Sequence, residues 1–137
     1  GARMNLAVGQ TLSAPAQMVR PEMMHVWAKV LRDPNPIHTD AEAVRARGWG
    51  DRVINQGPSN VAYVMNLLMS EAPQARLAEI KVRFLDNVFG GEMARPAATV
   101  RSIEETAQGR RITFDITLQA DGRLVLDGEA VMLAPSA

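Results

Sequence analysis

The chain has 137 residues, of which 47% are apolar and 22% are charged, and its 15 basic and 15 acidic side chains cancel. A chain of this length can bury one core, so we expect a single domain over residues 1–137. The balanced charge argues against nucleic acid and anionic membrane surfaces as partners and favours a small molecule or another protein. The absence of cysteine excludes disulfides, thiolate metal sites and cysteine nucleophiles, and it fits a reducing compartment.

No apolar run in the sequence approaches the length of a membrane span, and the first residues lack the apolar stretch of a secretory signal. We therefore expect no membrane partner and a cytoplasmic location.

Residues 21–31 form the first periodic segment. Met23, Trp27 and Val30 have the i, i+4, i+7 spacing of one helix face, and the proline at position 21 suits the first helical turn. His25 lies off this face, so we expect its side chain to be exposed to solvent.

Two further helices are expected before residue 72. The "TDAE" of residues 39–42 has the form of a capping box, and Gly48 is placed to end the short helix that it opens. A longer helix should follow with Gly57 as N-cap and Pro58 in its first turn. Its apolar side chains go nearly all the way round: Val61, Ala62, Val64, Met65, Leu67, Leu68 and Met69. Such a helix should be wrapped by other structure.

The second half of the chain has the alternation of strands with one dry face. The apolar members are Ala78, Ile80, Val82 and Phe84 in one run, and Ile112, Phe114, Ile116 and Leu118 in another. Asp121-Gly122 predicts a hairpin turn before the strand "LVLDGEAVML", while the glycines at 90, 91 and 109 mark other turns. Early helices and a late antiparallel meander predict an α+β fold in which a curved sheet wraps a buried helix.

Residues 31–38, "LRDPNPIH", contain the side chains best suited to proton transfer. Asp33 stands just past a helix end, where the helix dipole disfavours a carboxylate, and histidine, here His38, has the unperturbed pKa nearest neutrality. Five extended residues span up to about 16–18 Å, so the spacing does not require the two to meet. A proton-transfer site and a proline-rich connector both remain open. Asn35, between two prolines, can brace the turn.

Three segments resemble the MaoC-like (R)-specific enoyl-CoA hydratases. "RDPNPIHTDAEAV" is similar to their signature Gly-Asp-x-Asn-Pro-(Ile/Leu/Val)-His, "INQGPSNVAYVMNLL" to their turn and central helix, and "KVRFLDNVFGGE" to their strand and turn VRFxxPVFxGD. The matches span roughly residues 20–95 in the family's order. The resemblance implies a hot-dog fold and, because single hot-dog units pair their sheets, a homodimer or a higher homo-oligomer.

The resemblance also implies a reaction of fatty acid metabolism. A trans-2-enoyl-CoA thioester would be hydrated reversibly to a 3-hydroxyacyl-CoA, with Asp33 and His38 as the catalytic pair that activates water. The Gly57 amide, at the positive end of the central helix, would bind the thioester oxygen, and Gly57 and Asn35 are assigned to substrate binding. We expect no metal and no other cofactor, since the two histidines are 13 residues apart and no acidic cluster has ligand spacing.

Four positions depart from the family pattern. Arg32 replaces the usual glycine, Gln56 a frequent histidine, Pro58 a frequent methionine, and Asn87 the usual proline. Pro58 removes one amide donor beside Gly57.

Two alternatives to a CoA hydratase therefore stay open. One is a 3-hydroxyacyl-ACP dehydratase, and the other is a non-catalytic subunit of a heteromeric hydratase. A thioesterase on the same fold is disfavoured because the matched motif is that of the hydratases. The depth of the acyl pocket should depend on Met65 and Leu68, and Asn66 should either reach that pocket or be a satisfied core amide.

Overall fold

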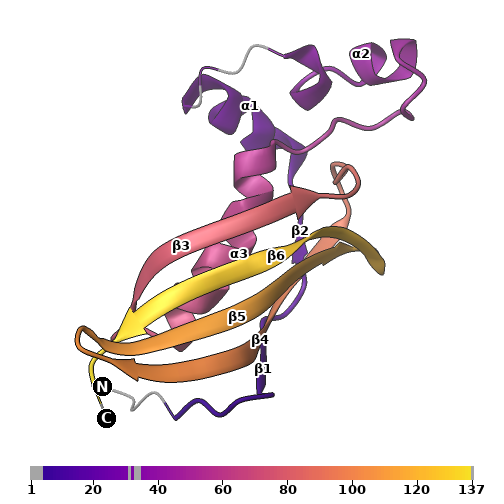
Figure 1. Cartoon of the computed structure of the whole chain (residues 1–137). Helices are drawn as coiled ribbons and strands as arrows, with labels where there is room; N and C mark the ends of the chain where they lie inside the picture. Colours follow the sequence, from indigo (N-terminus) through magenta and orange to yellow (C-terminus); the bar gives the residue numbers. More distant parts are fainter. Residues whose placement is uncertain (1–4, 31, 33–34, 137) are drawn as a thin grey trace.

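The computed structural model describes residues 5–30, 32 and 35–136, with the backbone alone at residues 24–27 and 30. A curved antiparallel sheet of six strands packs against one long helix, and two shorter helices lie beyond one end of the sheet (Figure 1). The elements in chain order are β1 (Thr11–Ser13), β2 (Gln17–Met18), α1 (Pro21–Val30), the 3₁₀ turn η1 (Pro36–His38), α2 (Ala41–Ala46), α3 (Gly57–Glu71), β3 (Arg76–Phe84), β4 (Met93–Thr106), β5 (Gly109–Ala120) and β6 (Arg123–Ala134).

The sheet has the strand order β1-β4-β5-β6-β3, and β2 also pairs with β4. Strands β4, β5 and β6 form a meander, which leaves β3 at an edge with β6 as its neighbour. Asp121 (φ 47°) and Gly122 (φ 81°) form the turn between β5 and β6. Two consecutive residues with positive φ are typical of a type I′ hairpin turn, so the predicted hairpin is confirmed.

The core lies between α3 and the face of the sheet that curves around it. Val64, Leu67 and Leu68 of α3 are buried in one cluster with the inward side chains of β5 and β6. The predicted inward set of β5, namely Ile112, Phe114, Ile116 and Leu118, is fully buried. The α+β prediction and the alternation of this strand are therefore confirmed.

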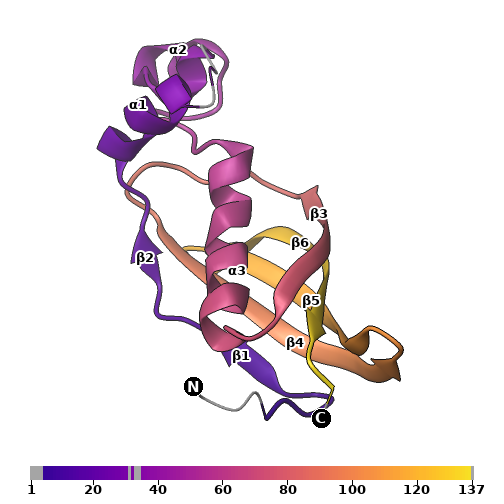
Figure 2. The ribbon, with the colours of Figure 1, turned by 90° about the vertical axis from the view of Figure 1, so that its left-hand side faces the viewer.

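The expectation of a wholly wrapped α3 is wrong. The sheet covers one side of the helix and leaves the opposite side open (Figure 2). Met69 is 46% exposed, and Asn66 is also exposed, which excludes the interpretation of Asn66 as a core amide. Apolar residues all round a helix therefore do not require burial on all sides in the isolated chain.

The alternation predicted for residues 78–84 is only partly correct. Ile80 and Val82 are half-buried, but Ala78 is exposed because a bulge between Leu77 and Glu79 shifts the phase of the strand. Phe84 is 56% exposed because it ends an edge strand, which has a neighbour on one side only.

Two predicted helix caps are each displaced by one residue. Asp40, not Thr39, caps α2 by accepting a hydrogen bond from the Glu42 amide (2.9 Å). Gln56, not Gly57, is the N-cap of α3. Gly48 does follow the end of α2 in a left-handed conformation (φ 70°), as predicted.

Candidate active site

His38 is the buried side chain at the centre of the candidate site. Its ring Nδ1 lies 2.6 Å from the Ile54 carbonyl oxygen. A carbonyl oxygen can only accept a hydrogen bond, so Nδ1 carries the proton and donates it. In the neutral ring, Nε2 then bears the lone pair, which is the arrangement that a general base needs.

His38 lies in the loop between α1 and α2, and it is bonded by Ile54, which lies between α2 and α3. The Ile54 amide donates to the Ile37 carbonyl oxygen (2.8 Å), so Ile54 binds this loop through both of its backbone groups. On its other side Ile54 forms an antiparallel bridge with Phe89. The position of His38 is therefore set by a short ladder of backbone bonds.

Asn35 braces the turn that precedes His38. Its side-chain oxygen accepts hydrogen bonds from the Ile37 amide (3.3 Å) and from Arg47 Nη1 (3.2 Å). These contacts agree with the bracing role expected for an asparagine between prolines. Asp33, the second predicted catalytic residue, lies outside the described residues.

Buried polar side chains surround the first turn of α3. In Figure 2 this turn lies just below α1 and α2. The Asn55 side-chain nitrogen Nδ2 donates to the Asn60 side-chain oxygen (2.7 Å). Among the described residues, no group pairs with the buried Ser59 hydroxyl oxygen. The Ser59 hydroxyl is therefore a buried polar group that is available to hydrogen-bond a bound molecule.

A hollow of about 600 Å³ opens beside this turn, between α3, β2 and the start of α1. Its polar lining includes Arg20, Asn55, Ser59, Tyr63 and Asn66. Burial raises the pKa of the Tyr63 phenol, which keeps it neutral as a hydrogen-bond donor. A volume of this size and a mixed lining are typical of small-molecule sites.

The residues expected to set the depth of an acyl pocket lie elsewhere on α3. Leu68 is fully buried in the core, and Met65 is half-buried, while Asn66 lines the hollow. The open face of the helix thus carries residues 59, 62, 63 and 66, which repeat at helical spacing.

Phe84 is a neighbour of Gly57 that sequence reasoning missed. A β-carbon added at Gly57 would lie 3.3 Å from Phe84 Cζ, so the aromatic ring rests against the glycine. The ring, being at the free end of an edge strand, remains half in solvent. Glycine at position 57 is therefore explained by its close packing against Phe84.

A profile of the MaoC-like domain family matches residues 4–121, most of the chain. The chain belongs to the MaoC-like domain family. No curated protein sequence matches it.

Solved structures with the same architecture cover nearly the whole MaoC-like chain. The (R)-hydratase from A. caviae involved in PHA biosynthesis is 22% identical with a TM-score of 0.86, over 97% of this chain and 100% of that one. The R-hydratase PhaJ1 from Pseudomonas aeruginosa is 24% identical with a TM-score of 0.82, over 96% and 84%. The truncated HadBC complex from Mycobacterium tuberculosis, a 3R-hydroxyacyl-ACP dehydratase, is 14% identical with a TM-score of 0.81, over 96% and 100%. At these identities the similarity establishes the hot-dog fold.

The geometry shows the cost of one departure of this MaoC-like chain from the family pattern. Arg32, where the family usually has glycine, has a φ of 52°. This left-handed region favours glycine, because a β-carbon there approaches the following carbonyl oxygen. The chain therefore holds Arg32 in a backbone conformation that lowers the stability of the fold.

Within residues 5–30, 32 and 35–136, no group of three His, Asp or Glu side chains is placed to hold a metal ion. The metal-free site stays a prediction. In the same part of the chain, no helix has the length and apolar character needed to span a membrane.

Proposed function

We propose that the protein is an enoyl-thioester hydratase, which adds water reversibly to a trans-2-enoyl-CoA to give the (R)-3-hydroxyacyl-CoA. The hydrogen bond from His38 Nδ1 to the Ile54 carbonyl oxygen carries this proposal, because it leaves Nε2 of the neutral imidazole as a proton acceptor. Membership of the MaoC-like domain family supports the same chemistry.

His38 and Asp33 share the proton transfers in this proposal. His38 Nε2 takes a proton from water as the water oxygen bonds to the β-carbon, and the carbon-carbon double bond becomes an enolate. A proton then reaches the α-carbon, so that water is added in full across the double bond. Asp33 is proposed to orient the water or to return the proton.

Gly57 is the proposed donor to the thioester oxygen, on which charge builds in the transition state. Its amide lies in the first turn of α3, where the helix dipole favours negative charge. Pro58 contributes no amide, so Gly57 has fewer donors beside it than in the usual family pattern. Asn35 then supports the substrate indirectly, by bracing the turn before His38.

The polar hollow is the proposed place for the rest of the substrate. It adjoins Asn55, the residue that follows Ile54, and its buried Ser59 hydroxyl and neutral Tyr63 phenol can bond amide or carbonyl groups. The proposed chemistry uses no metal or cofactor, so turnover should be unchanged by EDTA.

A homodimer is proposed to form through β3. In the described part of the chain, one edge of β3 pairs with no other strand, and Phe84 and Leu85 at its end are 56% and 45% exposed. An open edge with apolar ends is a template for a second copy. Light scattering after gel filtration tests this assembly. We also propose a single domain over residues 1–137 and a cytoplasmic location.

The decisive test follows the loss of the enoyl-thioester absorbance with crotonyl-CoA and with a longer 2-enoyl-CoA. His38→Gln, which keeps the size of the side chain, should lower kcat by about 10²–10⁴-fold with little change in Tm. His25→Gln is the matched control, since it alters the other histidine of the chain, and it should leave kcat unchanged. Equal losses in both variants, or a loss of kcat only in proportion to folded protein, would return His38 to a structural role.

The same acyl chain offered on CoA and on an acyl carrier protein separates the two carriers. Faster turnover on the carrier protein would favour the dehydratase alternative. Wild-type protein that is inert on both, and that co-purifies with a second hot-dog chain, would favour the non-catalytic subunit.

A further inference from the structure

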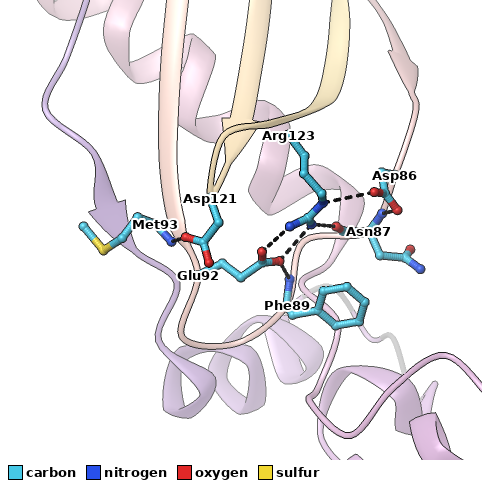
Figure 3. A network of polar contacts seen from close by, with 7 residues as sticks. All are labelled: Asp86, Asn87, Phe89, Glu92, Met93, Asp121 and Arg123. Carbon is cyan, nitrogen blue, oxygen red and sulfur yellow. Dashed lines mark hydrogen bonds and ion pairs between the residues drawn. The ribbon is translucent and has the colours of Figure 1, made fainter.

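An ion pair between the buried Glu92 and the half-buried Arg123 closes the loop of residues 86–92. Glu92 is 0% exposed and bonds Arg123, at the start of β6, through Nη1 (2.5 Å) and Nη2 (3.1 Å). Arg123 also donates to the Asn87 carbonyl oxygen (3.0 Å) and to Asp86 Oδ2 (3.2 Å). Figure 3 shows the guanidinium of Arg123 between Glu92 and Asp86. Arg123 therefore bonds the first and the last residue of the loop.

Glu92 passes this constraint to the backbone of the loop. Its Oε1 accepts a hydrogen bond from the Phe89 amide (2.8 Å), and its own amide donates to the Phe89 carbonyl oxygen (3.2 Å). Glu92 thereby bonds both the amide and the carbonyl group of Phe89. Figure 3 shows the bond from the Phe89 amide to the Glu92 carboxylate.

The loop in turn fixes residues 53–55, which belong to no named helix or strand. The Asn55 amide donates to the Val88 carbonyl oxygen (2.7 Å), and the Gly90 amide donates to the Val53 carbonyl oxygen (2.8 Å). Between these bonds lies the Ile54–Phe89 bridge. Ile54 is the residue whose carbonyl oxygen receives the proton of His38 Nδ1.

We infer that Glu92 and Arg123 are positioning residues for His38, acting through Phe89 and Ile54 on the orientation and tautomer of its imidazole ring. This inference rests on the proposed function for its kinetic consequence. It adds to that function a pair of charged residues, 31 positions apart in the chain, that touch neither the ring nor the hollow.

The physical reason is the sensitivity of proton transfer to geometry. If the Ile54 carbonyl oxygen moves, Nδ1 loses the acceptor that selects its tautomer, and a fraction of the rings carries the proton on Nε2 instead. Such a ring cannot act as a base. A displacement of about 1 Å in a catalytic group costs up to about 10²-fold in rate.

The first experiment needs no substrate. The chain has two histidines, so ¹⁵N NMR of the imidazole nitrogens gives two spin systems, and His25→Gln assigns them. In its neutral form, wild-type His38 should show a protonated Nδ1 and an unprotonated Nε2. Glu92→Gln and Arg123→Met should give mixed tautomers or a faster-exchanging Nδ1 proton.

The second experiment measures kinetics on the same variants. We expect kcat to fall about 10- to 100-fold while KM changes less than about threefold, because the hollow keeps its lining. Arg101→Met is the matched control: Arg101 also bonds two carboxylates, Asp115 and Glu129, but only on the exposed face of the sheet. It should leave both the imidazole signals and kcat unchanged.

If Arg123→Met does not fold, Arg123→Lys replaces it in both experiments, because lysine keeps the positive charge. Altered His38 signals in this milder variant would support the inference. Folded variants with the wild-type Nδ1 signal and kcat within about twofold of wild type would overturn it, as would the same change in Arg101→Met. A protein inert on every thioester would refute the proposed function, while the NMR result would still test the positioning of His38.

Discussion

Replacing Arg32 tests the conformation of the loop that leads into the site. Arg32 has a φ of 52°, and a non-glycine residue in this region costs about 1–2 kcal/mol. Glycine avoids that cost but loses about 0.4–1 kcal/mol through its more flexible unfolded state. Arg32→Gly should therefore be more stable than Arg32→Ala by about 0.5–1 kcal/mol, and this comparison cancels the loss of the arginine side chain.

Arg47 supplies the control, because it is an exposed arginine just after a helix with a φ of −90°. There the order should reverse, with glycine less stable than alanine. An unfolding entropy of about 2.1 cal/mol/K per residue over 137 residues converts the Arg32 difference into about 2–4 °C in Tm. Thermal unfolding by circular dichroism at one protein concentration measures it. Glycine less stable than alanine at both positions would refute the left-handed conformation of Arg32.

Three further predictions concern the core, the ion pair and the loop. Leu68→Ala should lower the free energy of unfolding by about 2–5 kcal/mol, whereas Met69→Ala, on the open side of α3, should change it by less than about 0.5 kcal/mol; denaturant titration checks both. Burial alone would raise the Glu92 pKa, but hydrogen bonds from Arg123 and the Phe89 amide, with nearby positive charge, leave that pKa lowered. The contribution of ionised Glu92 to the free energy of unfolding should thus be present above its unfolded-state pKa and be lost as the pH falls through its folded-state pKa. Glu92→Gln should therefore make the free energy of unfolding depend less on pH in that acidic range. A β-carbon at Gly90 would lie 2.8 Å from Pro21 Cγ, so Gly90→Ala should cost about 1–3 kcal/mol in the same titration.

Local patterns predicted the elements whose cause is local. The burial of β5 follows from strict alternation, and the turn at Asp121-Gly122 follows from two residues that tolerate positive φ. The existence of α3 follows from Pro58, which suits a first helical turn, and from the long apolar run after it. In each case a few neighbouring residues contain the whole physical reason.

Other features depend on parts of the chain that the pattern does not connect. Ala78 is exposed because a bulge shifts β3, and β4 is not marked by alternation alone, since it contains Pro96 and several alanines. Cap positions differ by one residue because the backbone angles, which the sequence does not show, decide which of two adjacent residues is the cap. The contact of Phe84 with Gly57 arises only after strand and helix have packed.

The candidate site was predicted as a short motif, but it is held by distant partners. The motif indicates His38, and its bond to Ile54 has no local signal because the two residues are 16 positions apart. The pairing of Glu92 with Arg123 could not be predicted from the sequence either, since the two residues are 31 positions apart and no local motif connects them. Asp33, the other half of the predicted pair, lies outside the described residues and stays a prediction.

Asn87 shows how a departure from the family pattern is compensated in space. Proline at this position would fix φ covalently and would have no amide to donate. Here the Asn87 amide donates to Asp86 Oδ1 (2.8 Å), and the Asn87 carbonyl oxygen accepts from Arg123 (3.0 Å). Hydrogen bonds thus restrain the amide and the carbonyl group of Asn87, whereas in proline the pyrrolidine ring would restrain the backbone. Because Arg123 makes one of these bonds and also holds Glu92, the loop that supports Ile54 depends on a single cation more heavily than it would with proline.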